Sequence, residues 1–152
     1  TSAMKPHLLT HTAHAPGTST AGIGGTLELA ESETDVEITI RARDPEAPNH
    51  RGETPSLQRV DLIVGEVTGQ ASDPSADTNP TTRVVRRFTE ADWLREGESL
   101  TMTHRLENVG TDHYIRVRGT NTQELEPSED PLGEDPWSDL WFYSNPIFIE
   151  VR

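Results

Sequence analysis

Apolar and polar residues alternate with a period of two along most of the chain, the pattern of β-strands that bury one face. In the stretch 36–42, four apolar residues alternate with Glu37, Thr39 and Arg41. Similar stretches, separated by turn residues, predict strands at 26–29, 36–42, 60–67, 83–88, 100–106, 114–118 and 141–151. Both faces of the stretch 60–67 are apolar, which indicates a central strand.

This set of strands, with turn-rich connections and no long helical period, predicts an all-β protein. The expected architecture is an antiparallel immunoglobulin-like β-sandwich of about seven strands with long acidic loops. A single helical turn is predicted at Thr89–Leu94, where Thr89 can cap the turn and acidic residues follow. The predicted core consists of Ile38, Ile40, Leu62, Val64, Leu100, Met102, Ile115, Val117, Trp141, Ile147 and Ile149.

Five of the chain's eight aromatic residues lie in its last sixteen positions, and four of these are in the segment DLWFYSNPIFIEV (residues 139–151) of the last predicted strand. On a continuous strand, Trp141 shares the apolar face with the odd-numbered aliphatic residues. Pro146 has no N–H to donate, so an edge position or a bulge is predicted there. The primary interpretation is a structural strand. The alternative is a ligand-binding face formed by three aromatic side chains: Trp137, Phe142 and Phe148.

Few large apolar residues occur before residue 26, so the predicted sandwich domain spans residues 26–152. Residues 1–4 look like a cloning remnant, and residues 5–25, rich in Gly, Thr and Ala, are predicted to be a linker or lead-in. His7, His11 and His14 have the spacing that would align three imidazoles on a helix, as a zinc site would require. Prolines and threonines disfavour that helix, so a lead-in without a metal is favoured.

Composition and charge exclude several classes of function. The net charge is -13, with 26 acidic against 13 basic residues, and such a surface repels nucleic acid and anionic membranes. There is no cysteine, so neither a disulfide nor a thiolate site is available. No apolar run approaches the roughly 18 residues of a membrane span, and no signal peptide is recognisable. Neither nucleic acid nor membrane is therefore expected as a partner.

The most acidic loop, residues 120–138, lies in a stretch without Lys or Arg between Arg118 and Arg152. Calcium takes six to eight oxygen ligands, and this loop could supply them. The spacing matches no EF-hand, so a solvated loop is favoured and calcium is the alternative. The candidate ligands are Asp130, Glu134, Asp135 and Asp139, with Glu129 beside them.

No arrangement of residues predicts catalysis. The chain has no GxSxG motif for a serine nucleophile. His104 falls on the apolar face of its strand and is predicted to be a hydrogen-bonded core residue rather than a ligand or base. No catalytic residue is therefore assigned.

Four segments resemble a known family: RVDLIVGEVTG (59–69), NPTTRVVRRFTEADW (79–93), YIRVRGTN (114–121) and WSDLWFYSNPIFIEV (137–151). They are similar to the C-terminal β-sandwich region of secreted bacterial PHP-type (polymerase and histidinol phosphatase) metallophosphoesterases, in which a similar YSNPI-containing strand closes the chain. The resemblance covers most of residues 26–151. It implies that the metal ligands, including a His-x-His pair, belong to a preceding catalytic barrel. His11 and His14 are separated by two residues and do not match that pair.

Two hypotheses about function follow. The first is a non-catalytic accessory domain that packs on the catalytic domain of the parent chain, outside the cell or in the periplasm as part of a longer secreted protein. The second is an extracellular carbohydrate- or surface-binding module that uses the exposed aromatics, with calcium in the acidic loop.

Overall fold

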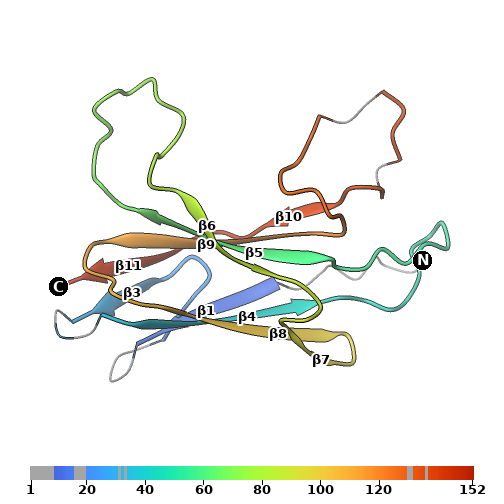
Figure 1. Cartoon of the computed structure of the whole chain (residues 1–152), viewed down its shortest axis with the longest axis horizontal. Helices are drawn as coiled ribbons and strands as arrows, with labels where there is room; N and C mark the ends of the chain where they lie inside the picture. Colours follow the sequence, from blue (N-terminus) through green and yellow to red (C-terminus); the bar gives the residue numbers. More distant parts are fainter. Residues whose placement is uncertain (1–8, 16–19, 31, 33, 130–131, 136) are drawn as a thin grey trace.

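A computed structural model describes residues 9–15, 20–30, 32, 34–129, 132–135 and 137–152 (Figure 1). These residues form eleven strands in two sheets. Sheet A has the order β2-β1-β4-β8-β7 and consists of β1 (Leu9–His14), β2 (Thr20–Gly22), β4 (Val36–Arg43), β7 (Leu94–Glu96) and β8 (Ser99–Leu106). Sheet B has the order β3-β11-β9-β5-β6, and β10 also pairs with β9; its strands are β3 (Thr26–Leu29), β5 (Arg59–Glu66), β6 (Arg83–Phe88), β9 (His113–Thr120), β10 (Trp141–Tyr143) and β11 (Ile147–Val151).

The two sheets pack face to face as a β-sandwich, so the predicted all-β fold class is confirmed (Figure 1). Strand pairs are antiparallel throughout except β3 and β11, which run parallel. Buried apolar residues of both sheets form a single core, to which every strand except β7 and β10 contributes. Ten of the eleven predicted core residues are buried in it. The described residues contain no helix, and hence none that could cross a membrane.

The region before residue 26 was predicted to be a linker or lead-in, and its described part is instead within the sandwich. β1 lies between β2 and β4 in sheet A, with His11 opposite Ile40 and Ala13 opposite Ile38. His11, Ala13 and Ala15 are buried against the core. The predicted boundary at residue 26 is therefore wrong for this stretch, while residues 1–8 lie outside the described residues.

The single helical turn predicted at Thr89–Leu94 is instead a tight turn between β6 and β7. The Asp92 N–H donates to the Thr89 carbonyl at 2.8 Å, and the Asp92 carboxylate accepts from the Thr89 N–H at 2.9 Å. The bonds that the Thr89 N–H and hydroxyl donate to this carboxylate lower the pKa of Asp92 below its ordinary value. Strand β7 begins at Leu94, so the chain returns to extended backbone immediately after the turn.

Candidate functional site

The aromatic run near the C-terminus forms two strands, β10 and β11, which both pair with β9. Trp141 lies opposite Thr120, and Ile147 lies opposite Ile115. Ile147 follows Trp141 by six positions, whereas their partners on β9, Ile115 and Thr120, are five positions apart. The extra residue means that residues 144–146 form a bulge. The Ser144 N–H donates to the Val117 carbonyl, and the Ser144 hydroxyl accepts from the Val117 N–H. The interruption predicted at Pro146 is confirmed.

The extra residue reverses the faces of the side chains on either side of it. Trp141 and Tyr143 point to the outer face of sheet B, as Phe148 does after the bulge. Phe142 points inward, and its ring would lie 2.1 Å from a Cβ placed on Gly119. The prediction that Trp141 is buried with the aliphatic residues of β11 is therefore wrong: it is half-buried on the opposite face.

On this outer face, two arginines hold Trp141 against the sheet. The guanidinium carbons of Arg59 and Arg118 lie 5.6 and 5.4 Å from the centre of the Trp141 ring, within cation–π range. Both arginines donate from Nε to Asp61, each at 2.9 Å and each to a different carboxylate oxygen. Asp61 is only 1% exposed. The buried Asp61 carboxylate therefore bridges two guanidinium groups, and each of its oxygens accepts a hydrogen bond from one of them.

The same arginines tie the beginning of the acidic loop to sheet B. Arg118 binds the Glu126 carboxylate at 2.5 and 2.8 Å and the Leu125 carbonyl at 2.9 Å. Arg59 donates to the main-chain carbonyls of residues 123–124. The bonds to Glu126 and then to Asp61 raise the pKa of Arg118, and Arg118 in turn lowers the pKa of Glu126. This part of the loop is anchored to the sheet through charged groups.

The remaining aromatic side chains of the outer face lie on an open sheet surface. Phe148 is 39% exposed and lies opposite Tyr114 on β9. Tyr143 is 51% exposed. Of the three aromatics predicted to form a binding face, Phe142 points inward and Phe148 is exposed on the outer face of sheet B. Trp137 lies instead in the loop that joins β9 to β10.

Trp137 lines a hollow of about 270 Å³ between the loop that joins β4 to β5 and the loop that joins β9 to β10. Both loops leave the sandwich at the same end (Figure 1). The ring of His50 packs edge-on against Trp137, with 5.7 Å between the ring centres and 63° between the planes. The lining residues are Glu53, Thr54, Pro55, Asn121, Asp135, Trp137 and Ser138.

Two of the carboxylates named as candidate calcium ligands form hydrogen bonds with other side chains of the protein. Glu134 accepts from the Ser138 hydroxyl at 2.6 Å, and Asp135 accepts from Arg51 at 2.8 Å. Asp139 is half-buried, and Asp130 lies outside the described residues. No three metal-ligating side chains gather anywhere in the described part of the chain. A calcium site in this loop stays a prediction.

The histidines do not come together either. His7 lies outside the described residues, and the side chains of His11 and His14 point to opposite faces of β1. His14 is exposed, with Nδ1 at 3.3 Å from the Thr20 hydroxyl. His11 is 1% exposed, and neither ring nitrogen has a hydrogen bond of normal geometry. Burial lowers its pKa to about 4, although the nearby backbone of Ile115 opposes part of this shift.

The core histidine is therefore His11, and the prediction of a core role for His104 is wrong. His104 is half-buried, and burial together with the charge of Arg86 lowers its pKa. Sequence reasoning missed His11 because it assigned residues 5–25 to a lead-in. The alternation of His11, Ala13 and Ala15 with polar residues was the available signal.

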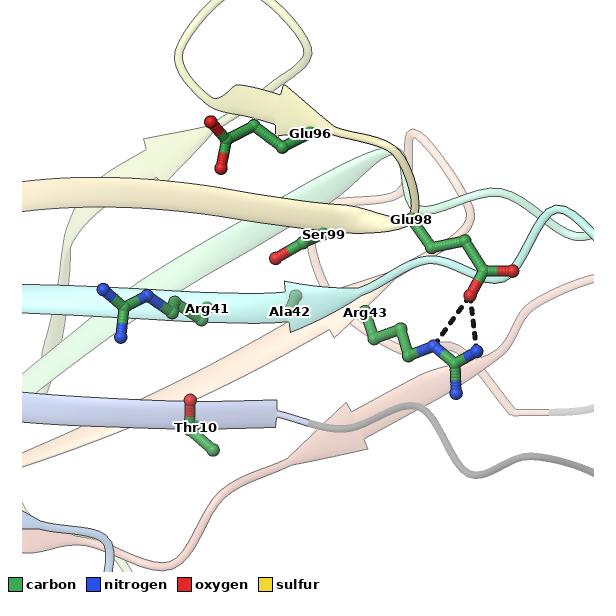
Figure 2. A pocket seen from close by; sticks show the side chains of 7 residues that line it. All are labelled: Thr10, Arg41, Ala42, Arg43, Glu96, Glu98 and Ser99. Atoms are coloured by element: carbon green, nitrogen blue, oxygen red, sulfur yellow. Dashed lines mark hydrogen bonds and ion pairs between the residues drawn. The ribbon is translucent and has the colours of Figure 1, made fainter.

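A second hollow of about 420 Å³ lies over β1, β4, β7 and β8 on the outer side of sheet A (Figure 2). Arg41 lies between Thr10 and Thr101 on the two neighbouring strands. Arg43 binds the Glu98 carboxylate through Nε at 2.8 Å. Figure 2 shows that the Arg41 side chain extends away from this ion pair. The charged groups around this hollow therefore do not converge on one point.

No family model matches the chain, and no curated protein matches its sequence.

Proposed function

We propose that the chain is a non-catalytic accessory domain, an immunoglobulin-like sandwich that packs on the catalytic domain of a secreted bacterial PHP-type metallophosphoesterase, outside the cell or in the periplasm. The observation that carries this proposal is that several carboxylates form ion pairs with arginines and so are not gathered as metal ligands. Asp61, Asp44 and Glu98 are tied to arginines. Metal-assisted hydrolysis needs a fixed cluster of ligands with an open position for water, and the described residues hold no such cluster.

The role of the YSNPI motif also supports this proposal. Residues 144–146 form the bulge between β10 and β11, and the Pro146 carbonyl accepts a hydrogen bond from the Gly24 N–H at 2.9 Å. The Ser144 hydroxyl is occupied by the Val117 N–H. The motif that carries the family resemblance therefore has a structural role, as expected for a domain without the reaction centre.

Two experiments test the proposal. The coding sequence upstream should contain a His-x-His pair and further metal ligands, and an unrelated upstream domain would overturn the assignment. The purified chain should not hydrolyse a chromogenic phosphodiester with Mn²⁺ or Zn²⁺. A variant with His7 and His14 replaced by alanine is the matched control, because His11 is a core residue. Turnover that this variant loses would contradict the proposal.

A further inference from the structure

The hollow beside Trp137 combines an aromatic ring with hydrogen-bonding groups from two loops. Its volume, about 270 Å³, is just under the range of roughly 300–1,000 Å³ typical of small-molecule sites. A hollow of this size accommodates a single ring of a longer molecule. Trp137 is half-buried, so part of the indole is available for contact.

Trp137 is held rigidly through its main chain. Its N–H donates to the Asp135 carboxylate at 3.1 Å, and its carbonyl accepts from the side-chain amide of Asn121 at 3.0 Å. The amide oxygen of Asn121 accepts from the Leu140 N–H at 2.7 Å. Asn121 directly follows β9, so the indole is positioned from a central strand of sheet B. Asn121 is thus a positioning residue for Trp137.

The facing loop is equally constrained. The side-chain oxygen of Asn49 accepts from the N–H groups of Arg51 and Glu53 at 2.9 and 3.0 Å. Gly52, with φ of +82°, closes this turn by donating to the Asn49 carbonyl. Arg51 then bridges to Asp135 in the other loop. Such preorganisation lowers the entropy cost of binding.

Charge decides which class of ligand fits. Arg51 lies between the two carboxylates, 2.8 Å from Asp135 and 3.9 Å from Glu53, and offsets one of their two negative charges. A cationic ligand would have to compete with Arg51, and an anionic ligand would meet two carboxylates. Each carboxylate retains unused lone pairs, because an ionised carboxylate has about four acceptor sites. The hollow therefore suits a neutral molecule that donates hydrogen bonds from hydroxyl groups.

We infer that this hollow is a binding subsite for a neutral sugar ring of an oligosaccharide. The apolar C–H face of the sugar packs on the Trp137 indole, which offers a large rigid apolar surface. Hydroxyl groups of the same ring donate to the free lone pairs of Glu53 and Asp135. Thr54 and Ser138 also line the hollow.

Isothermal titration calorimetry with four neutral hexasaccharides (cellohexaose, xylohexaose, mannohexaose and chitohexaose) tests this inference. At least one should bind with a Kd below about 10 mM, the affinity range of a small single site. Trp137→Ala should weaken this binding at least about tenfold, because truncating a central aromatic removes most of the contact. Glu53→Ala should weaken it too, without touching Trp137. Tyr143→Ala, an exposed aromatic outside the hollow, is the matched control and should leave binding unchanged.

Trigalacturonate and hexalysine, measured in parallel, should not bind at the hollow. Far-UV circular dichroism of each variant should match that of the parent chain, and Glu53→Ala supplies the test if Trp137→Ala does not fold. The inference is overturned if none of the four hexasaccharides binds. Binding that survives both substitutions overturns it as well, and so does hexalysine binding that Trp137→Ala abolishes, which would identify a basic peptide as the ligand.

Discussion

The buried imidazole of His11 predicts a loss of stability in mild acid. Its pKa is about 4 in the folded protein, against an ordinary value of 6.5. The unfolded chain therefore takes up a proton as the pH falls below 6.5, whereas the folded protein resists it until about pH 4. The contribution of neutral His11 to stability is thus complete above pH 6.5 and is lost as the pH falls to about 4.

The expected size follows from the two pKa values. Each pKa unit corresponds to about 1.4 kcal/mol, so the full loss is about 3 kcal/mol. About 2.5 kcal/mol of it should have disappeared by pH 4.5. The free energy of unfolding of a typical domain is about 5–15 kcal/mol, so this change is readily measured.

Urea unfolding at pH 7.5, 6.5, 5.5 and 4.5 provides the assay. His11→Leu should remove most of the pH dependence in this window, because leucine fills a similar volume without a titrating group. His14→Gln, on the exposed face of the same strand, should retain it. A parent protein with constant stability between pH 6.5 and 4.5, or a His11→Leu variant with the same slope as the parent, would refute the reasoning.

Other predictions concern the core, the charged cluster and the surface. Asp61→Asn should lower the free energy of unfolding by about 3–5 kcal/mol in urea titrations, because it leaves two buried guanidinium groups without their shared carboxylate; a loss below about 1 kcal/mol would contradict this. Gly119→Ala should destabilise the domain because its Cβ would collide with the Phe142 ring, and adding Phe142→Ala should recover part of the loss. Ile40→Ala should cost about 2–5 kcal/mol, as is usual for a large-to-small change in a packed core. Sodium chloride should raise the Tm or leave it unchanged, since it screens repulsion within a chain of charge -13; a steady fall would indicate that native ion pairs dominate. Calcium at matched ionic strength should add no further shift in Tm.

Strands with large apolar residues on one side could be predicted from the sequence. The predicted stretches 26–29 and 83–88 coincide with β3 and β6, and β4, β5, β8 and β9 differ from prediction by one or two residues at their ends. Alternation suffices there, because burying one face of such a strand is the main source of its stability. The same pattern identified the core residues of these strands.

Strand β1 could not be predicted in this way. Its buried face consists of His11 and Ala13, followed by Ala15, so it carries little apolar signal. Pairing with β2 and β4 makes it a strand, and the pairing with β4 joins residues far apart in the sequence. Tertiary context here outweighs local propensity.

The sequence alone therefore determined the all-β class, most of the core and the interruption at Pro146. Only the tertiary structure decided which face each aromatic residue takes, because a single bulge residue reverses the alternation between Trp141 and Phe148. It also decided that Trp137 and Glu53, which are 84 residues apart in the chain, line the same hollow. The alternation of apolar and polar residues shows only which side chains share a face of one strand. The meeting of two loops depends on where their strands end in the folded sandwich.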